Sequence, residues 1–320
     1  MDINSLLPLL LAAAAIAIGL LLLIKGGDWT IDAAVFIAER SGLSPLFIGA
    51  TILSFGTSVP ELFTSINANL SGYPGISLGN VLGSNVANIL IVLGATALVM
   101  PIGSRLRALW KDLAMMLLAT ALLAFGMYQG ILTRGFGAVM FVILVAFVTY
   151  QYFTDSLPLE DEADDDEAAH VETMKGAMIL LVLGLAALAL GAELLVEGAV
   201  AAGTALGISE AVIGMTVVAF GTSLPELSTC IAAARRRSVG LVLGNIIGSN
   251  TFNILSILGL TAMVKALDVP EVLMGRDLLV VIAVSVGFAL WMMFVKTITR
   301  PVGALMVLGY VGFIGMQFLG

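Results

Sequence analysis

The sequence predicts an all-α integral membrane protein with ten transmembrane helices, arranged as two inverted five-helix repeats. Composition is the first reason, because 60% of the 320 residues are hydrophobic, 11% are charged and the mean hydropathy is +1.09. Soluble domains are only about half apolar. The second reason is a series of apolar runs of about 20 residues, each long enough to cross a bilayer as a helix. The third is an internal repeat.

Ten apolar segments follow one another along the chain, five on each side of the acidic run EDEADDDEAAH at residues 160–170. The expected helices cover residues 6–37, 43–69, 75–99, 109–128, 135–153, 175–203, 208–234, 239–264, 277–296 and 301–319. Accordingly, residues 1–154 form the first repeat, residues 155–174 an acidic cytoplasmic linker and residues 175–320 the second repeat. A solvated linker is favoured over a regulatory calcium site, because the run lacks the ligand spacing of an EF-hand loop.

Two motifs occur once in each half. FGTSVPEL at Phe55 recurs as FGTSLPEL at Phe220, and GNVLGSNVANIL at Gly79 recurs as GNIIGSNTFNIL at Gly244. A single offset of 165 residues relates both pairs, without a gap. The alignment indicates a duplicated gene, and because five helices is an odd number, the second copy must enter the membrane from the opposite side.

The distribution of basic residues predicts the orientation, since cytoplasmic loops are enriched in lysine and arginine. With both termini outside the cell, ten basic residues fall on the cytoplasmic side: Arg40, Arg105, Arg107, Lys111, Lys175, Arg235, Arg236, Arg237, Lys296 and Arg300. Three fall on the opposite side: Arg134, Lys265 and Arg276. We therefore expect a multi-pass protein of the plasma membrane with both termini extracellular.

Polar residues on the second expected helix lie on one face. Ser54, Thr57, Ser58 and Glu61 are spaced three, four and seven residues apart, which is helical spacing. Pro60 has no N–H, so it breaks the helix and leaves backbone carbonyls without donors. Within a membrane such oxygens are tolerated only where they line protein or a cavity, where they can bind cations.

The same features recur on three other expected helices. The seventh carries Ala219, Thr222, Ser223, Pro225 and Glu226; the third carries Asn80, Ser84 and Asn88; the eighth carries Asn245, Ser249 and Asn253. The candidate metal-ligand atoms on these helices are all oxygens, which suit sodium or calcium rather than zinc or copper. The alternative is that these side chains only join helices to one another, as Ser, Thr and Asn often do in membranes. Asn67 and Asn69, near a helix end, are expected to be solvated.

The two glutamates explain why exchange of ions would be obligatory. A carboxylate inside the membrane is costly unless it is neutralised. If the inverted repeat brings Glu61 and Glu226 together, two negative charges can balance one divalent ion or most of a small group of sodium ions. An empty site would leave both charges uncompensated, so protonation or ion binding should accompany each crossing.

At these motifs the sequence resembles the sodium/calcium exchangers of the cation/calcium antiporter superfamily, in particular the compact prokaryotic ten-helix members. The resemblance rests on GTSVPEL with GNVLGSNVAN and on GTSLPEL with GNIIGSNTFN, and covers nearly the whole chain. It implies a secondary antiporter that exchanges sodium for calcium by alternating access. It also implies that the first and sixth helices form a bundle that slides against the other eight.

The resemblance assigns roles to the polar residues. Glu61 and Glu226 would be ligands shared by calcium and sodium, with the carbonyls of Thr57 and Thr222. The remaining ligands would fall into three groups: Ser58, Ser84 and the Ser54 carbonyl at one sodium site; Ser223, Ser249 and the Ala219 carbonyl at the other; and Asn88 and Asn253 in the middle.

Several alternatives stay open at this stage. Potassium-dependent relatives carry aspartate where this chain has Asn253, and proton-coupled relatives place an acid soon after the GN of the helix motif, so both rank behind sodium coupling. A cation channel is the alternative from another class, because polar helices also line pores. No enzyme activity, bound cofactor or nucleic-acid partner is expected. The expected partners are Ca2+, Na+ and the lipid bilayer, and the chain is expected to be a monomer.

Overall fold

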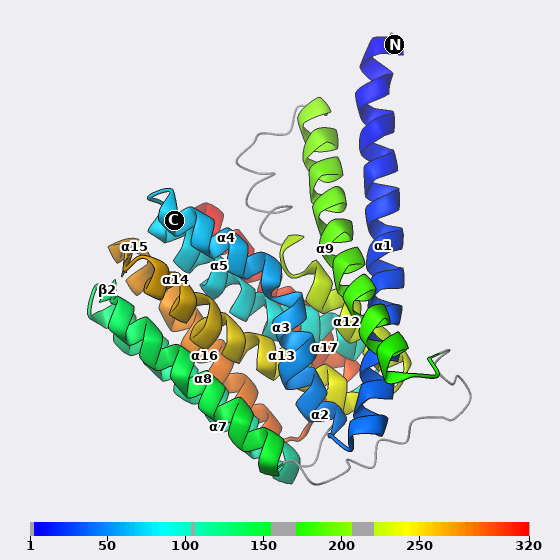
Figure 1. Ribbon diagram of the computed structural model, residues 1–320. Coiled ribbons are helices and arrows are strands. Elements are labelled where there is room, and N and C mark those ends of the chain that lie inside the picture. The colour runs from blue at the N-terminus through cyan, green and yellow to red at the C-terminus, as the bar shows by residue number, and fades with distance from the viewer. Residues whose placement is uncertain (1–2, 104–105, 155–170, 207–220, 320) are drawn as a thin grey trace.

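The computed structural model describes residues 3–103, 106–154, 171–206 and 221–319 (Figure 1). The first half contains α1 (Ile3–Ser41), α2 (Pro45–Ile48), the π-helix η1 (Gly49–Leu53), α3 (Ser54–Thr57), α4 (Val59–Leu70), α5 (Pro74–Ala87), the π-helix η2 (Asn88–Val92), α6 (Leu93–Val99), β1 (Ile102–Gly103), α7 (Leu106–Tyr128), β2 (Ile131–Leu132) and α8 (Arg134–Thr154). The second half contains α9 (Met174–Ala205), α12 (Leu224–Arg235), α13 (Val239–Phe252), the π-helix η4 (Asn253–Leu258), α14 (Gly259–Val264), β3 (Leu267–Asp268), α15 (Glu271–Met274), α16 (Arg276–Phe294), β4 (Thr297–Ile298) and α17 (Arg300–Leu319).

The described residues include seven helices that are long and apolar enough to cross a membrane, or eight if the bent helix from Pro45 to Leu70 counts as one span. The mostly helical membrane class predicted from the sequence is therefore confirmed. Most of the acidic linker, residues 155–170, and part of the seventh expected helix, residues 207–220, lie outside the described residues.

Helix α13 with its continuations η4 and α14 lies at the centre of the molecule. In this span an apolar stretch of 18 residues is 100% buried inside the protein, whereas the corresponding stretch of α8 is only 22% buried. The centre packs against α2, η1, α3, α7 and α12, so α13 contacts elements of both halves. The outer faces of α8, α16 and α17 carry exposed apolar side chains, as expected for helices that face lipid.

The second expected helix is broken where the sequence predicts. Segments α3 and α4 meet at Ser58, the helix axis bends by 44°, and Pro60 lies in the first turn of α4. Ser58 has φ −88° and ψ 2°, outside the helical region. Its repeat counterpart Ser223 has nearly the same angles, φ −90° and ψ 5°, at the start of α12. In both copies a helix therefore begins directly after the equivalent serine, which has nearly the same backbone angles.

Contacts between the halves are reciprocal. Strand β1 pairs with β4 and β2 pairs with β3, both antiparallel, so each half lends one short strand to each ladder. Likewise α6 packs on α17 and α14 packs on α8. These strands were not predicted. Such an exchange of equivalent partners is what a two-fold relation between the halves would produce.

Glycines allow the close approaches between the two halves. A Cβ atom on Gly94 would lie 2.9 Å from the Gly303 carbonyl oxygen, and the equivalent crossing pairs Gly137 with Gly259. Helices α1 and α9 run antiparallel side by side (Figure 1) and also meet at glycines. There a Cβ on Gly19 would lie 2.7 Å from the Gly191 carbonyl oxygen. Small residues of this kind let membrane helices pack closely without a cavity.

Helix α1 is also joined to α12. The Arg236 guanidinium lies 2.6 Å from the Asp32 carboxylate, and both side chains are half-buried. About two turns earlier, in α12, the Ser228 hydroxyl donates a hydrogen bond to the carbonyl of Leu23. The α1–α9 pair is thus held to the rest of the protein at the end of the molecule where α12 finishes.

The prediction that Asn69 is solvated is wrong, whereas Asn67 is exposed as expected. Asn69 is 2% exposed, and its Nδ2 donates to the Lys265 carbonyl at 2.7 Å. Lys265 returns a bond from Nζ to the Asn69 carbonyl at 3.0 Å. The sequence could not show that the end of α4 meets the end of α14, a contact between residues 196 positions apart.

The glycine crossings make a prediction about stability. In Gly303→Val the new Cβ would lie 2.6 Å from the Gly94 carbonyl oxygen, so α17 must move away from α6 at a cost of about 1–3 kcal/mol. We expect a lower melting temperature in detergent, measured by differential scanning fluorimetry. Gly312→Val is the matched control on the same helix, because a Cβ there meets nothing within 4 Å. Equal melting temperatures for the two variants would contradict the prediction.

Candidate cation-binding site

Two buried glutamates, one from each half, form the centre of the candidate site. Glu61 lies in the first turn of α4 and Glu226 in the first turn of α12, and each is 1% exposed. The starts of the two helices meet, because Ser58, at the break before α4, hydrogen-bonds the Glu226 carboxylate. Among the described residues, neither forms an ion pair with a lysine or arginine. Both acidic side chains are therefore buried inside the protein, and their convergence on one cation stays a prediction.

The hydroxyl residues at the two helix breaks surround these carboxylates. Ser58 Oγ donates to Glu226 Oε1 at 3.5 Å, a bond that crosses from the first half to the second. Thr57 is 2% exposed, and its hydroxyl has no hydrogen-bond partner among the described residues. In the second half Ser223 is 0% exposed, and its hydroxyl finds no partner in the part of the chain that the structure describes.

Glu61 and Glu226 both lie in the first turn of a helix. The first turn of a helix presents the positive end of the backbone dipole, which favours a carboxylate. The amide of Asn80 also fixes the first turn of α4, because its Nδ2 donates to the Glu61 carbonyl at 3.3 Å and to Ser65 Oγ at 3.0 Å. The Asn80 amide therefore ties the first turns of α4 to α5.

Ser54 lies where the two halves touch. Its hydroxyl donates to the Gly49 carbonyl at 2.8 Å and to the Asn245 carbonyl of α13 at 3.1 Å. A hydroxyl has a single hydrogen, so the two acceptors share it. The backbone carbonyl of Ser54, which was the expected ligand atom, accepts a hydrogen bond from the Ser58 N–H at 3.2 Å. Thr222 is half-buried beside Ser223. Ala219, whose carbonyl was the corresponding expected ligand, lies outside the described residues.

The two expected middle residues begin π-helical segments. Asn88 is the first residue of η2, Asn253 is the first residue of η4, and both are 1% exposed. Segment η2 packs against α12, which carries Glu226, and η4 packs against α4, which carries Glu61. Each asparagine thus lies on an element that contacts the glutamate helix of the other half. π-Helical turns often occur at functional sites, but no residue pattern in the sequence marks them.

Unpaired oxygen atoms indicate what the site can bind. Several buried side-chain atoms accept no hydrogen bond from the described residues: Oε2 of Glu61, Oε2 of Glu226, Oδ1 of Asn88, Oδ1 of Asn253 and Oγ of Ser249. Ser84, the repeat counterpart of Ser249, is 5% exposed on α5. Buried polar atoms are normally paired, and a hard cation would satisfy such a set of oxygens.

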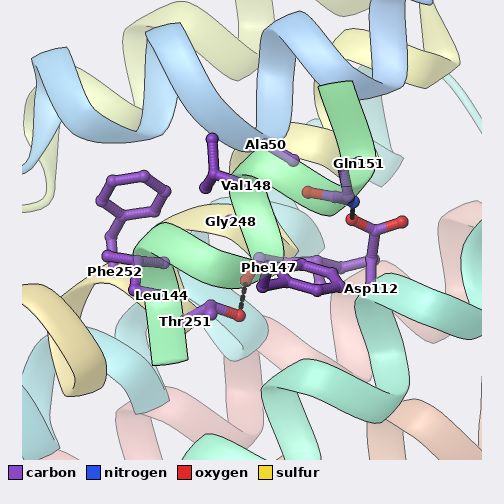
Figure 2. Close-up of a pocket in the computed structure, with 10 residues that line it drawn as sticks. Ala50, Asp112, Leu144, Phe147, Val148, Gln151, Gly248, Thr251 and Phe252 are labelled. Atoms are coloured by element: carbon purple, nitrogen blue, oxygen red, sulfur yellow. Dashed lines mark hydrogen bonds between the residues drawn. The ribbon is translucent and has the colours of Figure 1, made fainter. Parts of the chain in front are cut away.

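A small cavity lies beside this site and is distinct from it. Residues of η1, α7, α8 and α13 line it, including Asp112, Gln151, Gly248 and Phe252. Figure 2 shows Asp112 and Gln151 meeting at one end, where Gln151 Nε2 donates to Asp112 Oδ1 at 2.6 Å. None of the predicted ligands lines this cavity. Its polar end ties α7 to α8 and does not contribute to the candidate site.

Two buried asparagines outside the predicted ligand set also contact the site: Asn245, which belongs to the predicted polar stripe, and Asn85, which was not singled out. Asn245 accepts the Ser54 hydroxyl through its carbonyl, and Asn85 bonds to Asn253. Steps of four residues along the third expected helix select Asn80, Ser84 and Asn88 and pass over Asn85. The signal that could have identified it is the repeat itself, because the GSN motif ends in asparagine in both copies, at Asn85 and Asn250.

Comparisons with known proteins identify the family. The family model described as "sodium/calcium exchanger protein" matches residues 11–153 and 176–319. The inner membrane protein YrbG of Escherichia coli is 34% identical over 321 residues, covering 97% of this chain and 98% of its own length. The sodium/calcium exchanger MaX1 of Methanosarcina acetivorans is 32% identical over 338 residues, covering 94% and 97%.

A solved structure of a sodium-calcium exchanger shares the fold of this chain. The sodium-calcium exchanger NCX_Mj, in crystals soaked with Na+ and Sr2+, superimposes with a TM-score of 0.82 at 34% identity. The match covers 96% of this chain and 98% of that one. The two matched segments, one in each half, and the shared fold show that this chain is a multi-pass membrane protein that belongs to the sodium/calcium exchanger family.

Proposed function

We propose that this protein is a secondary antiporter that exchanges sodium for calcium across the cell membrane by alternating access. The observation that carries the proposal is the pair Glu61 and Glu226, which are buried together without a basic partner among the described residues. Calcium and sodium both prefer oxygen ligands. Family membership supports the choice of these two ions.

The proposed ligands follow from the site. Glu61 and Glu226 bind both ions, together with the carbonyls of Thr57 and Thr222. Ser58, Ser84 and the Ser54 carbonyl complete one flanking sodium site, and Ser223, Ser249 and the Ala219 carbonyl complete the other. Asn88 and Asn253 face the middle. The burial and the unpaired oxygens of the glutamates, the two asparagines and Ser249 support these assignments.

We also propose ten spans in two inverted five-helix repeats, residues 1–154 and 175–320, joined by a cytoplasmic linker. The reciprocal strand pairs and glycine crossings support this arrangement. Eight helices of the described residues are long and apolar enough to cross a membrane if the bent helix from Pro45 to Leu70 counts as one span. With α17 and the helix that contains α12, the proposed total is ten. One chain supplies both glutamates, so the site is complete in a monomer.

The proposed orientation places both termini outside. Arg134 and Lys265 lie next to the β2–β3 ladder, whereas Lys296 and Arg300 lie next to the β1–β4 ladder. In this orientation the β1–β4 ladder is cytoplasmic, together with the end of α12 that carries Arg236. The excess of basic residues on that side supports the assignment.

An asymmetry between the halves supports alternating access. Helix α1 packs extensively on α12, but its repeat counterpart α9 has no comparable packing on α4 within the described residues. The α1–α9 pair thus covers α12 more than α4. A displacement of this pair that exchanged the two contacts would close the opposite side, and the glycines between α1 and α9 would let them move as one body.

The glutamates make a direct prediction. Glu61→Gln or Glu226→Gln removes one of two charges that a calcium ion needs, at a cost of about 3 kcal/mol or more, or at least about a hundredfold in flux. We expect sodium-dependent calcium uptake by proteoliposomes to be abolished while the gel-filtration profile stays unchanged. Glu271→Gln, at an exposed site on α15, should transport like the wild type. Wild-type flux in either site variant would exclude this site.

Ion coupling can be tested with the same vesicles. Vesicles loaded with sodium should accumulate calcium, because the two charges must be neutralised for each crossing. Vesicles loaded with potassium or choline, or given only a pH gradient, should take up no more calcium than protein-free vesicles. Uptake without any counter-ion would indicate a channel, and uptake driven by the pH gradient would indicate proton coupling.

A further inference from the structure

Asn85 connects the two halves at the level of the candidate site. It lies on α5, is 1% exposed and makes two hydrogen bonds to the helix formed by α13 and η4. Its Nδ2 donates to the Asn250 carbonyl at 3.5 Å. Its Oδ1 accepts a hydrogen bond from Asn253 Nδ2 at 3.2 Å. One side chain therefore contacts two residues a single helical turn apart.

The chemistry of these groups sets the direction of both amides. A backbone carbonyl can only accept a hydrogen bond, so the atom of Asn85 that faces Asn250 must be its NH2 group. The oxygen of Asn85 is then turned toward Asn253, and the atom of Asn253 that faces it must also be NH2. Asn253 Oδ1 consequently points away from Asn85, buried and without a partner among the described residues.

The other half lacks this arrangement. The repeat counterpart of Asn85 is Asn250, and its Nδ2 donates to the Ile246 carbonyl of its own helix at 2.7 Å. Asn88, the counterpart of Asn253, has neither amide atom paired within the described chain. Only one of the two middle asparagines is therefore held in a defined orientation.

We propose that Asn85 is a positioning residue that holds the Asn253 amide with its oxygen, rather than its NH2 group, directed at the transported cation. An NH2 group turned toward a cation would repel it, whereas the amide oxygen is a good ligand. A carboxylate at position 253 would need no such control, because its two oxygens are equivalent. This inference rests on the proposed function, because it assumes that the site binds calcium.

The experiment compares Asn85→Ala with Asn250→Ala. Both remove a buried amide from equivalent positions of the repeat, but only Asn85 contacts Asn253. In Asn85→Ala the amide of Asn253 can turn over, and the loss of one oxygen ligand should raise the calcium KM of uptake and the Kd of calcium binding about tenfold. In Asn250→Ala both constants should stay within about twofold of wild type.

A double-mutant cycle separates positioning from packing. Both constants are measured for Asn253→Asp with and without Asn85→Ala. Because the aspartate oxygens are equivalent, removing Asn85 should change neither constant by more than about twofold. Asn85→Asp is the conservative variant and the alternative if Asn85→Ala does not fold. It has the same shape and still accepts from Asn253 Nδ2, so neither constant should rise.

Four outcomes would overturn the inference: unchanged constants in Asn85→Ala, an equal rise in Asn250→Ala, the same rise when position 253 is aspartate, or a rise in Asn85→Asp. Equilibrium binding of calcium in detergent keeps the test independent of transport. A wild-type protein that binds calcium but does not exchange it would contradict the proposed function and leave the test of Asn85 intact.

Discussion

The structure depends on the burial of two like charges at one place inside a membrane protein. A carboxylate removed from water without a partner costs several kcal/mol, and here two lie together without a lysine or arginine among the described residues. A cation is the charge that can balance them. The helix breaks at Ser58 and Ser223 follow from this need, because they place carbonyl oxygens and helix N-termini where intact helices would offer neither.

A duplicated sequence accounts for the pair of glutamates. One acidic side chain per repeat is sufficient if the two repeats face each other, and the reciprocal strand and glycine contacts bring them into that relation. Because the two repeats face each other, equivalent elements of the two halves lie on opposite sides of the site. In the described residues the α1–α9 pair packs on α12 without comparable packing on α4, so the symmetry of the repeats is broken in one direction. Alternating access requires that the opposite direction be attainable at similar free energy.

The sequence predicted features that depend on local chemistry. Apolar runs located the spans, Pro60 located the break, and the repeat identified Glu61 and Glu226 as partners. It did not predict features that depend on contacts between distant residues. The strands contain two residues each and are stabilised only by pairing across halves, and Asn69 is buried by Lys265 of the other half. The orientation of Asn253 depends on Asn85, whose role follows from hydrogen-bond direction rather than from spacing.

The central claim is that both carboxylates bind the same dehydrated cation. Crystals soaked in strontium test it most directly, because strontium replaces calcium at oxygen sites and gives an anomalous signal. The account predicts one strong anomalous peak in contact with the carboxylates of both Glu61 and Glu226, which weakens as sodium in the soak is raised. A peak that contacts only one of them, or strontium bound only at the acidic run of residues 160–170, would contradict it.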